Sequence, residues 1–175
     1  KLYAPPPDNQ DPNSSPTGIT VWQFPEWFVT QDVQASDKER NVRSRYLVHR
    51  TLLIKGKFND PDRRKRAVVP VRFVRACKNG HIGDIDWYAF VHGGNTDCRR
   101  QLWMDERGTS GDLSEIWVRC ECEKARRMID AGKIQTRALG NCDGSRPWLG
   151  PYTKEACGEP NRMLIRTASN AYFPQ

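Results

Sequence analysis

The sequence predicts an α+β domain in which a small mixed sheet and short helices precede an irregular C-terminal region. Three observations lead to this fold class. The 175 residues have the length of one ordinary domain. Six Trp, five Tyr and six Phe supply enough aromatic bulk for a folded core. Short apolar segments follow one another without a regular β-α-β alternation, which favours α+β over a parallel sheet.

The N-terminal half begins with a Pro-rich segment, residues 1–17, whose composition is typical of coil. Residues 21–28 concentrate apolar bulk around Pro25, which argues against a central strand and predicts an anchoring edge segment. Residues 46–55 and 67–76 are rich in Val, Leu, Ile and Phe and predict two strands. The polar residues 56–66 between them predict their connecting loop.

The C-terminal half predicts shorter elements. Asp84 is expected to cap a helix from Ile85 that ends at Gly93. Residues 101–104 and 116–120 predict strands, and residues 124–131 predict a helix stopped by Gly132.

This order predicts three parts. Residues 1–20 form a Pro-rich arm or linker, residues 21–119 an α+β core with a basic loop, and residues 120–175 a metal-binding subregion packed on the core. The chain has no apolar run of the roughly 18 residues that a membrane helix needs, and it begins without a signal-peptide pattern. We therefore expect a soluble, cytoplasmic protein. Because its first residue is Lys1, we also expect it to be part of something larger.

Positive charge is concentrated in one segment. The whole chain carries a formal net charge of +7, but residues 38–75 hold thirteen bases and three acids. Such a block predicts phosphate contact, and DNA-binding candidates are Arg63, Arg64, Lys65, Arg66, Arg43 and Arg45. Two alternatives are a solvated basic loop and a scaffold that meets an acidic partner surface.

Six cysteines favour metal over disulfides, because the expected compartment is reducing. The predicted zinc ligands are Cys120, Cys122, Cys142 and Cys157, in which a Cys-x-Cys pair supplies two thiolates from one turn. Two disulfides in a secreted fragment are the alternative. A second four-ligand set, weaker in its spacing, is Cys77, His81, His92 and Cys98. For Cys77, simple burial at the end of an apolar strand is the alternative.

The alternative to a binding protein is a metal-dependent nuclease domain. In that case the catalytic candidates are His81, Asp84 and Asp86, which could hold a hard cation for phosphodiester hydrolysis. No further carboxylate cluster or activated nucleophile accompanies them, and no Walker loop is present. The sequence therefore predicts a binding protein rather than an enzyme, and it excludes the ATP motor itself.

Several motifs together resemble a known family. They are the stretch Arg72–Trp87, with its Ala-Cys-x-x-Gly-His-x-x-Asp spacing, the segment Arg166–Pro174, the Cys-x-Cys pair, and Arg146-Pro147-Trp148. They resemble the DrmB family of DISARM phage-defence proteins from about Val21 to Pro174. The resemblance implies a non-catalytic subunit that joins a DrmA-like helicase subunit, binds DNA with it and restricts phage DNA. It also implies that the four late cysteines bind zinc.

One position pair departs from the family pattern. Family members often carry a C-x-x-C after the Phe-Pro-x-Trp segment, but here Thr30 and Val33 occupy those positions. The resemblance therefore implies no additional metal site there.

Overall fold

The computed structural model describes residues 4, 6, 7, 11, 13, 21–33, 35–37, 42–108, 110–150 and 152–166, with only the backbone of 35–37. Most of the predicted 1–20 arm and nearly all of the 166–174 motif therefore lie outside the described residues. Strands dominate the fold and all of their pairings are antiparallel in the described chain. In the same residues no helix is both long and apolar enough to cross a bilayer.

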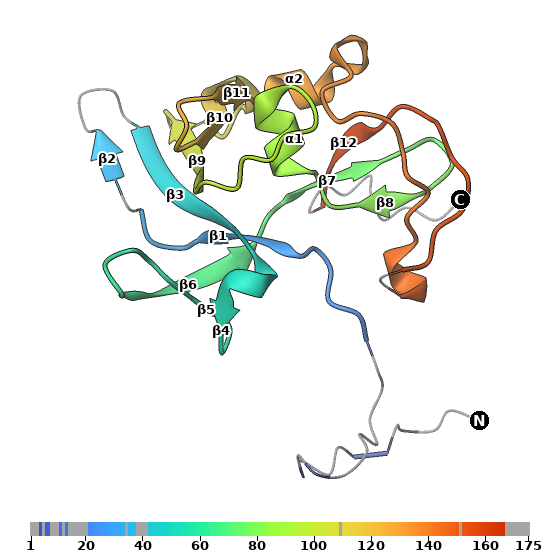
Figure 1. The fold of residues 1–175 in the computed structure, drawn as a ribbon, viewed down its shortest axis with the longest axis horizontal. Coiled ribbons are helices and arrows are strands. Elements are labelled where there is room, and N and C mark those ends of the chain that lie inside the picture. The colour runs from blue at the N-terminus through green and yellow to red at the C-terminus, as the bar shows by residue number, and fades with distance from the viewer. Residues whose placement is uncertain are drawn as a thin grey trace.

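A nine-stranded sheet forms the larger layer (Figure 1). Its path runs β11-β10-β9-β3-β1-β6-β5-β4, and β2 pairs with β3 beside that path. The strands are β1 Trp27–Thr30, β2 Ala35–Asp37, β3 Val42–His49, β4 Leu53–Ile54, β5 Lys57–Asn59, β6 Lys65–Pro70, β9 Leu102–Arg107, β10 Ile116–Cys120 and β11 Ala125–Arg127. The sheet is therefore larger than the small sheet that the sequence predicts, and it is antiparallel rather than mixed.

A second sheet of three strands stands beside the first, in the order β12-β7-β8. Its strands are β7 Phe73–Ala76, β8 Ile82–Gly83 and β12 Arg162–Ile165. Val71 and Arg72 separate β6 from β7, so one apolar run of sequence supplies a strand to each sheet.

Two short helices connect the sheets: α1 Trp87–His92 packs on β10 and β11, and α2 Ile129–Gly132 packs on β11 and β12 (Figure 1). The N-cap of α1 is Asp86, whose carboxylate accepts the Ala89 N–H at 2.9 Å, rather than Asp84. Gly93 ends this helix with φ at 78°, a left-handed conformation that glycine adopts without the penalty of a Cβ. Four 3-10 turns complete the described helical structure: η1 Arg50–Leu52, η2 Leu113–Glu115, η3 Ile134–Thr136 and η4 Pro147–Leu149.

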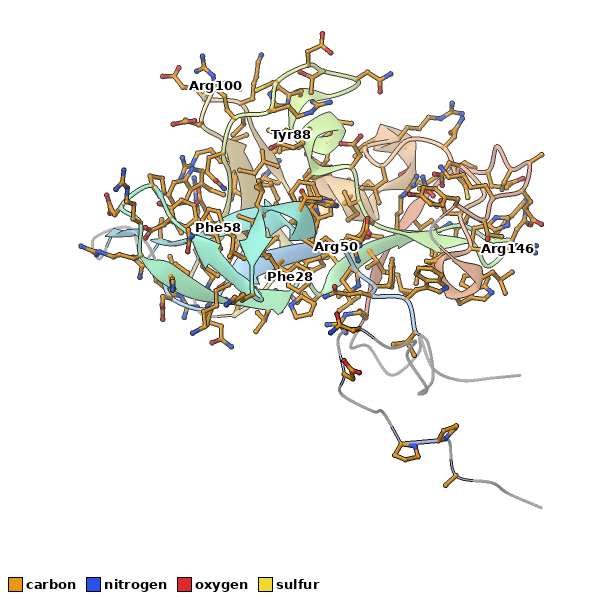
Figure 2. All side chains as sticks on the ribbon, turned by 60° about the horizontal axis from the view of Figure 1, so that its bottom comes forward. Phe28, Arg50, Phe58, Tyr88, Arg100 and Arg146 are labelled. Atoms are coloured by element: carbon orange, nitrogen blue, oxygen red, sulfur yellow. The ribbon has the colours of Figure 1, made fainter. Side chains whose placement is uncertain are left out.

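The core lies on both faces of the larger sheet, because successive side chains of a strand point to opposite faces. Leu47 and Leu102 belong to the main core, which also holds the buried Trp87. Phe28 and Phe58 lie on the opposite face with Tyr46, in a smaller cluster (Figure 2). Trp103 packs against that smaller cluster, with its ring 4.1 Å from that of Tyr46. Both Trp87 and Trp103 therefore pack in the fold.

Three sequence expectations about elements are wrong. Residues 27–30 form β1, which lies between β3 and β6, because the strand begins two residues after Pro25 and loses no hydrogen bond to it. Residues 125–127 form β11 instead of a helix, since the chain reverses after Cys120 and pairs with β10. Residues 57–59, expected in the loop between two strands, form β5, which pairs with β4 and β6.

Candidate metal centres

The first group of converging ligands, here called cluster A, consists of Cys77, His81, Cys142 and Cys157. Their ligand atoms all lie within 4.8 Å of one another. Cys77 follows β7 and His81 precedes β8, and the tight turn between them is closed by the Cys77 N–H donating to the His81 carbonyl at 3.0 Å. The Cys142 N–H donates to the Glu159 carbonyl at 2.7 Å, which fixes the third ligand next to the approach to β12.

Cluster A has donors that stabilise negative sulfur. The Gly144 N–H points to Cys142 Sγ at 3.3 Å, and the Asn79 side-chain amide lies 3.6 Å from Cys157 Sγ. Burial favours the neutral thiol of Cys77, but hydrogen bonds from the backbone N–H groups of His81 and Asn79 and from the Cys142 and Cys157 thiols together outweigh burial and lower its pKa. Burial raises the pKa of Cys142 to about 11. The site therefore favours a first thiolate at Cys77, while further thiolates require a compensating positive charge.

The second group, cluster B, consists of His92, Cys98, Cys120 and Cys122, and its ligand atoms also lie within 4.8 Å of one another. His92 is the last residue of α1 and Cys120 the last residue of β10. Between Cys120 and Lys124 the chain forms a knuckle, closed by the Cys120 N–H donating to the Lys124 carbonyl at 2.8 Å. The knuckle supplies Cys122 as well as Cys120, which is the use of the Cys-x-Cys pair that the sequence predicts.

Electrostatics in cluster B resemble those in cluster A. Hydrogen bonds from the Lys124 backbone N–H and from the Cys120 thiol lower the pKa of Cys122 to about 6, which favours its thiolate form. Burial raises the pKa of Cys120 to about 12. His92 Nε2 lies 3.2 Å from Cys122 Sγ, and its Nδ1 lies 2.8 Å from the Tyr88 carbonyl.

Both groups have the dimensions of a tetrahedral thiolate site. Four bonds of about 2.3 Å to sulfur place the sulfur atoms about 3.8 Å apart at the corners of a tetrahedron. Cys98 and Cys120 are 3.6 Å apart at sulfur, and Cys77 and Cys157 are 4.0 Å apart. A disulfide would need about 2.05 Å, and all six cysteines are free. The donor sets of three Cys and one His therefore fit a metal ion and do not form the disulfides of the alternative.

The structure divides the eight candidate ligands differently from the predicted grouping. Cys120 and Cys122 do not share a site with Cys142 and Cys157, and the second predicted set is likewise split between the two clusters. The reason is antiparallel pairing. Cys120 at the end of β10 pairs with Leu102 at the start of β9, which brings in Cys98.

The same geometry brings cluster A together. Ala76 at the end of β7 pairs with Arg162 at the start of β12, so Cys77 lies near the segment that carries Cys157. Sequence spacing groups neighbours, whereas antiparallel pairing groups the end of one strand with the beginning of another. Strand pairing would have been the signal needed to sort the ligands.

The carboxylates of the nuclease alternative have other roles. Asp84 accepts the Glu26 N–H at 3.0 Å, and Asp86 caps α1. His81 belongs to cluster A, 3% exposed. Within the residues that the structure describes, clusters A and B are the groups of three or more Cys, His, Asp or Glu whose ligand atoms converge. The His81, Asp84 and Asp86 set does not converge on one ion.

The six basic candidates fall into two classes. Arg66 donates to the buried Asp60 at 2.8 Å, and both Arg43 and Arg45 face Glu106 at 3.9 and 3.6 Å. The other three, Arg63, Arg64 and Lys65, are exposed at the turn between β5 and β6, and in the described structure their side chains form no ion pair. Lys55 and Lys57, which the sequence interpretation did not single out, are exposed on the same β4-β5-β6 unit.

Comparison with known proteins agrees with the motifs. A family model described as a domain of unknown function, DUF8724, matches residues 1–173. The DISARM protein DrmB of Bacillus paralicheniformis is 31% identical over 170 residues, which cover 93% of this chain and 28% of that protein. The chain thus spans less than a third of the length of this relative. The predicted DrmB resemblance is confirmed, and the chain belongs to the DUF8724 domain family.

Proposed function

We propose that this chain is a non-catalytic, zinc-binding accessory module of an anti-phage defence system that partners a helicase and contributes to DNA binding. The observation that carries the proposal is the pair of Cys₃His clusters, each with the dimensions of a tetrahedral site. The similarity to DrmB, whose name places that protein in DISARM, supports the defence role.

Zinc is the metal that this donor set fits best. Three thiolates and one imidazole are soft and borderline ligands, which select zinc over magnesium or calcium. Four protein ligands also leave no open position for water or substrate, an arrangement typical of structural rather than catalytic zinc. Cys77, His81, Cys142 and Cys157 would hold one ion, and His92, Cys98, Cys120 and Cys122 the other. Free thiols suit the reducing cytoplasm in which we place the protein.

DNA contact is proposed for the β5-β6 turn. Arg63, Arg64 and Lys65 are exposed there and not engaged in the ion pairs that hold Arg43, Arg45 and Arg66. Exposed, unpaired Lys and Arg are the groups that neutralise phosphates and release counterions. We assign the helicase partner from the resemblance of the sequence motifs to the DrmB family, and the name of the relative supports membership of DISARM.

Metal analysis tests the proposal directly. The purified chain should contain about two zinc ions. Elemental mass spectrometry measures the zinc content, and native mass spectrometry of the protein counts the ions bound per chain. Cys142→Ser should remove the ion of cluster A, and Cys98→Ser that of cluster B, because each cluster has its own four ligands. A chain that is folded and metal-free would overturn the zinc assignment. Loss of a single shared ion in both variants would instead overturn the division into two clusters.

A further inference from the structure

Cluster A closes the base of a hairpin that spans residues 142–157. The Arg146 N–H donates to the Thr153 carbonyl at 3.0 Å, and the Glu155 N–H to the Gly144 carbonyl at 3.1 Å. Ser145 and Lys154 form an antiparallel bridge between them. Both ends of the hairpin, Cys142 and Cys157, are ligands in cluster A. A metal bound in cluster A would thus close the base of a hairpin whose two arms are joined by these two backbone hydrogen bonds.

The two hairpin arms approach each other very closely at Gly144. A Cβ built there would lie 1.7 Å from the Glu155 carbonyl oxygen, and the backbone has φ at +72°. Only glycine suits such a position. Glu155 is therefore held in one place by its own backbone, directly beside the cluster.

The side chain of Glu155 links the cluster to the hairpin tip. His81 Nδ1 lies 3.3 Å from Cys77 Sγ, so this nitrogen faces the other ligands. The opposite nitrogen, Nε2, is hydrogen bonded to Glu155 Oε1, and Glu155 Oε2 forms an ion pair with Arg146. Cluster B has the reverse arrangement, in which His92 Nε2 faces Cys122 while Nδ1 contacts the Tyr88 carbonyl.

Building on the proposed zinc sites, we propose that Glu155 is a positioning residue that keeps His81 in the tautomer ligating through Nδ1 and, through Arg146, couples cluster A to the hairpin tip. A carboxylate that accepts the second N–H of a ligating histidine fixes the ring and strengthens its metal bond. Glu155 does so with one oxygen and holds the tip with the other.

The tip carries the side chains whose placement this coupling would control. Trp148 is 55% exposed, Leu149 57% and Tyr152 92%. Arg146, at the start of the tip, lies at the end of the molecule away from Phe58 and the basic turn (Figure 2). Order at this apolar end should therefore depend on cluster A and not on the basic turn.

The experiment compares Glu155→Ala with Glu155→Gln in the zinc-loaded 175-residue chain. Zinc affinity is measured by chelator competition, and exchange of backbone amides in residues 144–154 by mass spectrometry. Glu155→Ala should weaken cluster A about 10–100-fold, leave cluster B unchanged and increase exchange at the tip. Glu155→Gln should recover most of the affinity, because its carbonyl oxygen still accepts the His81 N–H. Long-range proton–nitrogen NMR correlation spectra of the histidine rings should show that His81 binds the metal through Nδ1 and His92 through Nε2.

Two controls separate this role from general damage. Glu159→Gln changes a nearby side-chain carboxylate that pairs with Lys78 at 3.1 Å. Because it keeps the Glu159 backbone carbonyl that accepts the Cys142 N–H, it should leave both affinities unchanged. Arg146→Ala should increase exchange at the tip while His81 stays bound through Nδ1. His81 bound through Nε2, or Glu155→Ala indistinguishable from Glu159→Gln in a two-zinc protein, would refute the coupling. An absence of zinc from the parent chain would refute the proposed function itself, so the two failures are distinguishable.

Discussion

Asp84 is a carboxylate with one satisfied and one buried, unsatisfied oxygen. Its Oδ2 accepts the Glu26 N–H at 3.0 Å, whereas Oδ1 is buried without a hydrogen-bond partner among the described residues. Burial raises the pKa of Asp84 above its ordinary value of 3.8, and the charge of Glu26 raises it further. A carboxyl group with a raised folded-state pKa stabilises the fold only while protonated.

We therefore expect the free energy of unfolding to lose a contribution from Asp84 as pH rises from about 4 through the raised pKa. Asp84→Asn should remove this decline and make the protein more stable than the parent at pH 7, with no difference below about pH 3. Urea unfolding at a series of pH values measures this. Asp86→Asn is the matched control, because Asn caps a helix about as well as Asp and Asp86 is exposed. Parallel pH profiles for the parent and Asp84→Asn would contradict the expectation.

For single residues, the sequence predicted which side chains are candidate ligands better than it predicted which of them share a site. All eight predicted cysteine and histidine ligands lie in the two clusters, but they are grouped differently from the prediction. The assignment of Asp84 as a helix cap was wrong by two residues, because Asp84 and Asp86 precede the same helix and only the backbone path decides which one reaches the free N–H groups.

The β5-β6 unit presents its positive charge from an ordered turn. The buried Asp60 accepts the Arg64 N–H at 2.8 Å and the Arg66 Nε–H at 2.8 Å. Burial opposes ionisation of Asp60, but these two hydrogen bonds and the positive charges of Arg66 and Arg64 together outweigh burial and lower its pKa. Because Arg66 is the partner of a buried carboxylate, its removal should destabilise the unit. This corrects the sequence interpretation of residues 63–66 as one free basic loop.

Replacement of Arg63, Arg64 and Lys65 by Ala should weaken DNA binding without unfolding the protein. The slope of log affinity against log salt should fall by about 0.9 for each duplex phosphate that is no longer neutralised, and by about 2.7 at most. Titration of labelled duplex at several salt concentrations, with the helicase subunit added if the chain alone binds weakly, measures the slope.

A second triple variant, in which Arg100, Lys133 and Arg162 are replaced by Ala, removes the same charge from other exposed positions and serves as the control. Equal effects of the two triple variants on the slope would indicate a nonspecific charge effect. An unchanged slope in both would favour a scaffold with an acidic protein partner.

Elements were predictable where local pattern and tertiary pairing agree. Residues 116–120 form a strand as predicted, and the predicted helix ends at Gly93. Residues 125–127 have helical composition but form β11, because the Cys120–Lys124 knuckle aligns them with the open edge of β10. Tertiary hydrogen bonds overrode a local propensity worth only tenths of a kcal/mol per residue.

With metal bound in both proposed sites, the stability of the whole molecule would depend on that metal as well as on its apolar core. Between Cys142 and Cys157 the described residues contain one named element, the 3-10 turn η4, and both clusters tie strand ends to loops. Structural zinc contributes about 10–16 kcal/mol in finger peptides. That is at least as large as the roughly 5–15 kcal/mol by which a whole domain is normally stable.

Excess chelator should therefore abolish cooperative thermal unfolding of the chain, and added zinc should restore it. Scanning calorimetry and near-UV circular dichroism follow this change, with a non-chelating buffer as the reference. Limited proteolysis of the chelated chain should cleave first within residues 142–157. A chelated protein that keeps the same transition temperature would contradict a structural role for the metal.

Along the chain, the ligands of cluster B all fall between the second and third ligands of cluster A, so one site is nested inside the other. During synthesis, cluster B would be complete before Cys142 emerges, and it would already have shortened the free chain that cluster A must close. Closing a shorter loop costs less entropy. Damage to the inner site should therefore weaken the outer one, whereas damage to the outer site should leave the inner one intact. This asymmetry gives assembly of the domain a direction, from the centre of its sequence outward.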